Sequence, residues 1–373
     1  QDRKEQLVYR TSPTNIGLAL LAVVASYDLK YEKLEDTINL LDKMLETINK
    51  LPKWNGHLYN WYDIKSLKPL MPKYVSTVDS GNLVGYLYAL KQFLLNVQEG
   101  NEYKNTIEIN QKANNENKKV EEKLSDELRE KITNNIETIN YLIENTNFSY
   151  LYSKENRIFS IGFNVEENNL TPSYYDLLAS EARQASLIAI AKKDVPAKHW
   201  YNLSRTLTSL NRYKGLVSWS GTAFEYLMPN VNIPTYQGSL LSESSKFAIY
   251  SQQEYAKKLN IPWGISEAAF NLKDLNNNYQ YKAFGIPWLG LKRGLADETV
   301  VSSYGTILAI NDSPHATIEN LKRLEQEGMY NKYGFYESID YTLNRLKKGQ
   351  KSAVVKTYMA HHQGLILLSI TNL

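Results

Sequence analysis

Apolar residues recur at helical spacing along much of the chain. Residues 16–27 and 34–48 show the pattern most clearly, and Ser12-Pro13-Thr14 ahead of the first stretch offers a cap and a first-turn proline. These two stretches predict a helical hairpin. Further helices are expected over residues 83–97, 124–144, 174–191, 197–210, 240–259, 299–310, 316–326 and 354–371. Only a few short strands are expected, for instance at residues 158–163.

Long connections rich in Gly, Pro, Trp and Tyr separate the predicted helices. They cover residues 54–74, 217–237, 262–295 and 330–340. Loops of this length inside a compact protein usually carry function. Helix pairs joined alternately by short turns and long aromatic loops favour an all-α toroid, an α/α barrel, with the long loops gathered at one end. The sequence shows neither βαβ alternation nor a glycine-rich phosphate loop, so a nucleotide-binding sheet has little support.

Residues 98–119 differ from the rest of the chain, because they are polar and nearly without aromatic residues. We interpret them as an exposed insertion rather than a domain boundary, since the helical pattern resumes afterwards. The prediction is a single domain over residues 1–373. The start at Gln1, without an initiator Met or a signal-peptide pattern, suggests a piece of a larger multidomain chain. The longest apolar run, residues 16–26, is too short to span a membrane, so no membrane contact is expected of this segment.

Charge and composition narrow the classes of function. The chain has 43 Lys and Arg against 40 Asp and Glu, a balance that argues against nucleic acid as a partner. It has no Cys, which excludes disulfides, Cys-ligated zinc, iron–sulfur clusters and a thiol nucleophile, and no cofactor is expected. The most informative bias is aromatic, with 28 Tyr and 6 Trp. Such rings stack on sugar faces, and equally often they fill cores.

Four glutamates lie in segments that carry aromatic or small residues: Glu181, Glu225, Glu267 and Glu337. Cleavage of a glycosidic bond needs two acids of different protonation state, which makes these residues candidates. Glu267 follows Ser266, which could cap a helix beginning there, and the positive end of that helix would favour the ionised carboxylate. Three of these acids also have a structural interpretation. Glu181 fits a solvated or salt-bridged helix residue, Glu225 a buried cap of backbone amides, and Glu267 a first-turn acid.

Two aspartates and a histidine pair complete the candidate polar residues. Asp63 and Asp79 could bind sugar hydroxyls, although helix entry explains Asp79 nearly as well. His361 and His362 are adjacent, so on a helix they point about 100° apart, and no second His follows at four-residue spacing. No metal site is therefore expected. Hydrogen bonding to a substrate hydroxyl or a carboxylate, or a satisfied interior histidine, fits the pair better.

Seven motifs, in order, resemble the glycoamylase-like middle domain of cyclic β-1,2-glucan synthases, which is a transglycosylation module. They are TSPTNIGL at residues 11–18, NGHLYNWYD at 55–63, VDSGNL at 78–83, SWSGT at 218–222, WGISE at 263–267, YGFYE at 333–337 and MAHHQG at 359–364. The resemblance spans nearly the whole chain. Inverting endo-β-1,2-glucanases are related to the same domain.

The resemblance implies an (α/α)6 barrel and a retaining attack on linear β-1,2-glucan that closes the chain into a ring. It places the acid/base on Glu181, in the Ser-Glu-Ala-Arg motif, and the nucleophile on Glu267. It implies a bacterial protein that acts in the cytoplasm, with flanking synthase domains and a full-length chain anchored in the inner membrane. An inverting endo-β-1,2-glucanase and a non-catalytic glucan-binding module are the alternatives. The implied substrate-binding residues are Trp61, Tyr62, Asp63, Asp79, Arg183, Trp219, Phe224, Glu225, Tyr336, Glu337, His361 and His362.

Overall fold

The computed structural model describes residues 7–100 and 124–373 of the chain. Of the insertion expected over residues 98–119, all but the first three residues lie outside this part. The described helices are α1 (Pro13–Asp28), α2 (Leu34–Lys50), α3 (Thr77–Gln98), α4 (Asp126–Asn145), α5 (Ala182–Ala191), α6 (Lys198–Asn202), α7 (Ala223–Leu227), α8 (Leu240–Leu259), α9 (Ser303–Ile307), α10 (Pro314–Gln326) and α11 (Ala360–Thr371). Three short 3₁₀ helices cover Phe148–Leu151, Met228–Val231 and Leu343–Arg345.

Small antiparallel sheets lie in the connections between the helices. Six are hairpins or strand pairs: β1 (Arg10–Thr11) with β4 (Tyr62–Asp63), β2 (Lys53–Trp54) with β3 (His57–Leu58), β6 (Tyr152–Ser153) with β7 (Ile158–Phe159), β10 (Leu207–Leu210) with β11 (Tyr213–Leu216), β12 (Ala268–Lys273) with β13 (Tyr279–Lys282), and β15 (Tyr330–Asn331) with β16 (Gly334–Phe335). Two have three strands: β5 (Tyr74–Ser76), β8 (Gly162–Asn164) and β9 (Asn169–Leu170), and β14 (Val300–Ser302), β17 (Ser338–Asp340) and β18 (Ala353–Val355). The fold is therefore mainly helical, and the all-α prediction was too simple.

The helices that form where predicted have both a periodic apolar face and a usable start. Helix α1 begins with Pro13 behind Ser12, whose hydroxyl accepts from the main chain of Asn15. Four other predicted helices were wrong in extent. The stretch 174–191 is helical only from Ala182, and 197–210 divides into α6 and β10. The stretches 299–310 and 354–371 begin as strands β14 and β18, because their Val pairs join the same sheet as β17.

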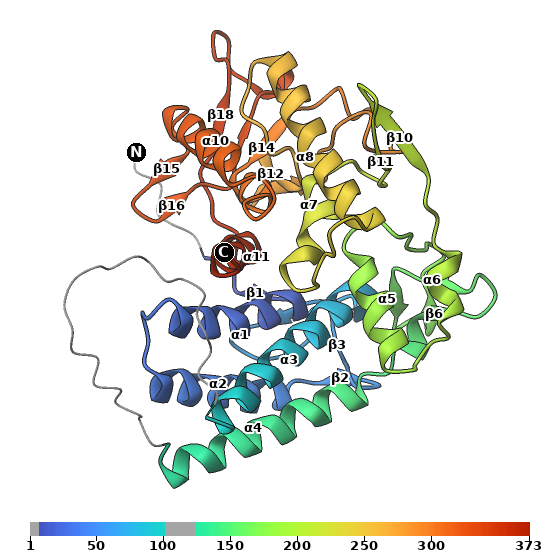
Figure 1. Cartoon of the computed structure of the whole chain (residues 1–373), viewed down its shortest axis with the longest axis vertical. Coiled ribbons are helices and arrows are strands. Elements are labelled where there is room, and N and C mark those ends of the chain that lie inside the picture. Colours follow the sequence, from blue (N-terminus) through green and yellow to red (C-terminus); the bar gives the residue numbers. More distant parts are fainter. Residues whose placement is uncertain (1–6, 101–123) are drawn as a thin grey trace.

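The helices contact one another in a regular order. Helix α1 packs against α3 and α11, α3 packs against α5, and α9 packs against α7 and α11. Each even-numbered helix up to α10 packs on one helix of this series: α2 on α1, α4 on α3, α6 on α5, α8 on α7 and α10 on α9. Figure 1 shows α11 beside α1, so that the last helix of the chain returns to the first.

Glycine brings two of these helices unusually close. A Cβ atom on Gly81 of α3 would lie 2.4 Å from the Cβ atom of Ala185 on α5. A side chain at position 81 would push the two helices apart. The close contact at Gly81 therefore keeps Asn82, the next residue of α3, near the start of α5. Two buried apolar clusters flank α1, one including Leu18 and the other Leu20. Within the described ranges 7–100 and 124–373, no helix combines the length and apolar character that a membrane crossing requires.

Candidate active site

Glu181 is buried at the beginning of α5. Ser180 before it has a left-handed backbone, with φ of 52°, which is uncommon for a residue with a side chain. Asn82 on α3 donates a hydrogen bond from Nδ2 to Oε1 of Glu181 at 2.7 Å, and the Ser180 hydroxyl donates to Oε2. Burial raises the pKa of Glu181 above its ordinary value, although both hydrogen bonds oppose the rise. A carboxyl that retains its proton in this way suits a general acid.

Glu267 lies immediately before β12. The Tyr281 hydroxyl donates to its Oε2 at 3.2 Å, and the Tyr304 hydroxyl donates to its main-chain carbonyl at 2.8 Å. Burial, followed by the charges of Glu225 and Glu181, raises the pKa of Glu267 to about 8. The three glutamates are therefore close enough to influence one another's ionisation.

The sequence-based interpretation of Ser266 and Glu267 was wrong in one respect. No helix starts there, because the chain enters β12, and the Ser266 hydroxyl instead accepts from the main chain of Phe224 at 3.0 Å. Glu267 consequently lacks the helix terminus that would favour its anion. Its raised pKa is the opposite of the ionised state expected from the sequence.

The raised pKa predicts how stability depends on pH. Between the ordinary glutamate pKa and about 8, the folded chain holds a proton on Glu267 that the unfolded chain releases, so this residue lowers stability as pH rises. Glu267→Gln removes the titrating group. We therefore expect the variant's melting temperature, relative to that of the original chain, to increase from about pH 5 to about pH 8.

Thermal unfolding monitored by circular dichroism across this range measures the difference. Glu155→Gln, at an exposed turn, serves as the control for a glutamate away from the cavity. A difference between the Glu267 variant and the original chain that does not change with pH would contradict the predicted protonation.

A cavity of about 540 Å³ opens beside Glu267 and beside Ser180, which precedes Glu181. Its lining includes Glu267 and Ser180, the residue next to Glu181, together with Glu225, Tyr174, Tyr175 and Trp219. Trp219 is 58% exposed, so one face of its indole is available to stack on a ligand. The combination of carboxyl groups and accessible rings suits a sugar chain.

Glu225 has a largely structural environment. It forms a capping box with Thr222 at the start of α7. Its carboxylate also accepts from the Ser218 hydroxyl at 2.8 Å and from the main chain of Ser220 at 3.0 Å. These contacts match the interpretation of Glu225 as a buried cap, while its place in the cavity wall and its charge still affect Glu267.

Glu337 and His362 form a buried pair. His362 Nδ1 lies 2.7 Å from Oε1 of Glu337, and both side chains are 1% exposed. The His362 ring stacks on Tyr304 with ring centres 3.7 Å apart. His361 lies beside Phe224, in an edge-to-face contact at 5.6 Å, and burial lowers the His361 pKa well below its ordinary value. Glu337 and the histidines are therefore linked to Glu267 through Tyr304.

Residues 173–373, more than half of the chain, match the Glycoamylase family model. The chain belongs to the glycoamylase-like family. Its resemblance to the glycoamylase-like domain of cyclic β-1,2-glucan synthases is also confirmed by a curated relative. The cyclic β-(1,2)-glucan synthase NdvB of Rhizobium meliloti is 35% identical over an alignment of 460 residues, which covers 98% of this chain and 16% of the synthase. The glycoamylase-like chain thus spans about one sixth of the length of that relative.

Solved structures show the same fold at low sequence identity. The endo-β-1,2-glucanase of Chitinophaga pinensis is 13% identical, with a TM-score of 0.70 over 98% of this chain and 82% of that one. The β-1,2-glucanase of Parabacteroides distasonis is 14% identical, with a TM-score of 0.72 over 97% of this chain and 51% of that one. At these identities the likeness concerns the fold of the glycoamylase-like chain.

Arg183 and Asp79 have protein partners in place of the hydroxyls expected for them. Arg183 donates to the main-chain carbonyls of Glu225 and Tyr226 at 2.6 and 2.7 Å. Asp79 Oδ1 accepts from the main-chain nitrogen and the hydroxyl of Thr14, at 3.2 and 2.6 Å. Both residues support the elements that carry the glutamates in this glycoamylase-like domain.

Tyr62 and Asp63 are corrections to the predicted sugar-binding set. Tyr62 is fully buried, and its hydroxyl donates to the Pro52 carbonyl at 2.6 Å, so no ring face is accessible. Asp63 accepts from the main chain of Ser66 at 2.7 Å in an exposed turn. Neither lines the cavity.

Three other predicted aromatic residues lie outside the cavity lining. Phe224 is buried, Trp61 is half-buried with the Arg10 guanidinium 4.5 Å from its ring, and the Tyr336 ring lies 5.3 Å from that of Tyr358. The sequence interpretation also missed Asn82, Tyr281 and Tyr304. Asn82 could have been selected from the sequence, because it is the last residue of the Asp-Ser-Gly-Asn motif. No sequence signal distinguishes Tyr281 from the other tyrosines.

Proposed function

We propose that this chain is an anomer-retaining transglycosylase that acts on linear β-1,2-glucan and forms cyclic β-1,2-glucan. The observation that supports this most directly is one cavity whose wall includes Glu267, Trp219 and Ser180, the residue whose hydroxyl contacts the Glu181 carboxyl. The name of the synthase relative and the names of the glucanases with this fold support β-1,2-glucan as the substrate.

The proposed reaction has two steps. An oxygen of ionised Glu267 attacks C1 of a glucose unit, the bond from C1 to the leaving oxygen breaks, and protonated Glu181 gives its proton to that oxygen. Ionised Glu181 then takes a proton from a hydroxyl at the other end of the same chain. That hydroxyl attacks C1, the bond to Glu267 breaks, and the ring closes with its original anomeric configuration.

The two raised pKa values affect the proposed roles differently. A raised pKa suits Glu181 as the proton donor. For Glu267 it means that the anion is disfavoured in the empty cavity. The positive charge that develops at C1 in the transition state stabilises this anion when the glucan is bound.

The proposal extends to the architecture. The contacts of α1 with α3, α3 with α5, α7 with α9, α9 with α11 and α11 with α1 support an inner ring of six helices, with α2, α4, α6, α8 and α10 outside it, as in an (α/α)6 barrel. We propose that residues 1–373 form one domain of a larger bacterial synthase. In that protein the domain would work on the cytoplasmic side, next to flanking synthase domains and a membrane anchor. The chain matches only 16% of the length of the synthase relative, which supports the presence of flanking domains.

Incubation with linear β-1,2-glucan tests the function. We expect cyclic products, identified by mass spectrometry as lacking one water relative to linear chains of equal length. The number of reducing ends should stay unchanged, because the leaving part of the glucan keeps its own, whereas hydrolysis adds one with each cleavage. Shorter linear products with an inverted anomeric configuration would instead indicate an endo-β-1,2-glucanase. Binding of the glucan with no new product, unaffected by Glu267→Gln, would indicate a binding module.

A further inference from the structure

We infer that Asn82 is a positioning residue that fixes the orientation of the Glu181 carboxyl group and directs its acidic proton to Oε2, on the side of the cavity. This inference rests on the proposed function, in which Glu181 is the proton donor. Asn82 is fully buried on α3 and does not line the cavity. It therefore acts through Glu181 and has no direct role in the chemistry.

The hydrogen bonds around Asn82 set the orientation of its amide. Its Oδ1 accepts from Nε2 of Gln184 at 3.2 Å, so the NH₂ group must face the other side. That group donates to Oγ1 of Thr14 at 3.0 Å and to Oε1 of Glu181 at 2.7 Å. An amide group has two N–H donors, and both are used.

The hydrogen bonds of Thr14 and Asp79 are consistent with this orientation of the Asn82 amide. Thr14 accepts from Asn82 and therefore donates its own proton to Oδ1 of Asp79, at 2.6 Å. Asp79 Oδ1 also accepts from the Thr14 main chain. In the amide orientation that satisfies both of its neighbours, Asn60 donates to Oδ2 of Asp79 at 3.0 Å. Each of these contacts donates to the Asp79 carboxylate, so the hydrogen bonds keep the same direction from Asn82 through Thr14 to Asp79.

The consequence for Glu181 is an asymmetry between its two oxygens. Oε1 always faces an N–H donor and cannot carry a proton directed at Asn82. Oε2 contacts the Ser180 hydroxyl, which can either donate or accept, and Ser180 lines the cavity. The proton of the acid form therefore resides on Oε2, next to the cavity. The left-handed backbone of Ser180 places its hydroxyl there, at a conformational cost typical of functional sites.

The groups that interact electrostatically with Glu181 come from several elements, and the test must keep them unchanged. They are Asp79 and Tyr86 on α3, Arg183 on α5, Tyr175 before α5, Tyr304 on α9 and Glu267 before β12. Asn82→Leu removes the donor without adding charge. Asn82→Asp keeps the shape and places an acceptor against Oε1. Asn135→Leu, at a buried asparagine on α4, is the matched control.

Carbon-13 NMR of glutamate side chains, with the Glu181 signal assigned from Glu181→Gln, measures the titration of Glu181 without any need for turnover. Loss of the donor favours the neutral carboxyl, so we expect Glu181 to titrate at higher pH in Asn82→Leu and higher still in Asn82→Asp. Asn135→Leu should leave the titration unchanged. Equal titration of Glu181 in all four proteins would overturn the inference, whether or not the chain acts on β-1,2-glucan.

A second readout separates positioning from a merely structural role. On β-1,2-glucan, whose leaving group needs a proton, we expect both Asn82 variants to lose about 10- to 100-fold in kcat. On a dinitrophenyl β-sophoroside, whose leaving group needs none, they should keep nearly the original rate of the first step. Equal losses on both substrates would contradict positioning of the proton. Absence of turnover in the original chain would refute the proposed function while leaving the NMR result decisive for Asn82.

Discussion

We expect Glu267→Gln to lower the turnover of linear β-1,2-glucan by at least about 10⁴-fold, because an amide cannot form the glycosyl-enzyme bond. The substitution keeps the size of the side chain and an oxygen that can accept from Tyr281. Glucan affinity should therefore change little. Product analysis by mass spectrometry and binding by calorimetry, on the same preparation, separate lost chemistry from lost binding.

Stereochemistry tests whether Glu267, and not Glu181, is the nucleophile. With Glu267→Ala and an aryl β-sophoroside, azide should enter the vacated space, displace the phenolate and give the α-glycosyl azide. With Glu181→Ala, azide should attack the glycosyl-enzyme from the opposite side and give the β-glycosyl azide. Exchange of the two products between the variants would reverse the roles, and rescue in neither would argue against a retaining mechanism.

The sequence predicts best those parts of the fold that local chemistry determines. Helix α1 has a serine cap, a first-turn proline and a continuous apolar pattern, and all three depend on neighbouring residues. Helix α5 begins eight residues later than predicted, at Ala182, because Ser180 adopts a left-handed backbone that no composition rule indicates. Strand β12 follows a serine and a glutamate that read as a helix start. Its pairing with β13 is a tertiary interaction that outweighs this local signal.

In the candidate site, too, the sequence indicates the residues but not the properties that depend on tertiary contacts. The order of the motifs singles out Glu181 and Glu267 as candidates, but their protonation depends on burial and on neighbouring charges, which only the folded chain defines. Trp61 and Tyr62 are adjacent in one motif. The strand pairing of Tyr62 turns its ring fully inward while Trp61 stays half-buried, so motif membership could not distinguish a ligand-facing ring from a core ring.

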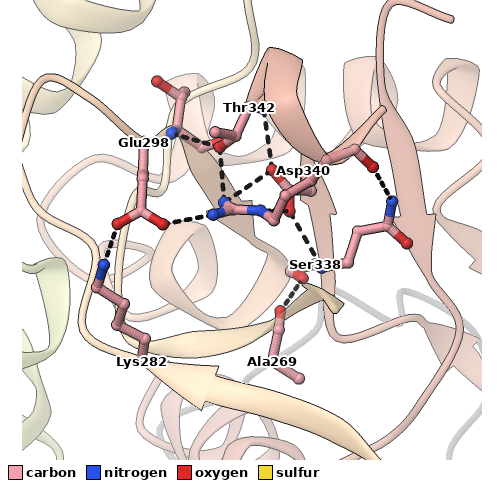
Figure 2. Close-up of polar contacts among 9 residues, drawn as sticks. Ala269, Lys282, Glu298, Ser338, Asp340 and Thr342 are labelled. Carbon is pink, nitrogen blue, oxygen red and sulfur yellow. Dashed lines mark hydrogen bonds and ion pairs between the residues drawn. The ribbon is translucent and has the colours of Figure 1, made fainter. Parts of the chain in front are cut away.

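We predict the largest effect on stability for an ion-pair network that contacts β12. Arg345 donates from Nε to Oδ2 of Asp340 at 2.7 Å, and it also pairs with Glu298 (Figure 2). The Asp340 side chain is fully buried, that of Arg345 is 10% exposed, and Oδ2 of Asp340 also accepts from the main chain of Asn271 on β12 at 3.0 Å. Arg345→Met leaves a buried carboxylate without its cation. We expect it to lower the free energy of unfolding by about 3–5 kcal/mol, measured by urea denaturation.

Two further variants determine whether this loss comes from the unpaired charge. Lys322→Met breaks an ion pair with Glu319 in which both side chains are more than half exposed, so it should leave the free energy of unfolding nearly unchanged. Arg345→Met combined with Asp340→Leu removes both charges, so it should recover much of the stability lost by Arg345→Met alone. If the double variant is no more stable than Arg345→Met, the network contributes through packing and the hydrogen bond to Asn271, and the charge pairing is not what stabilises β12.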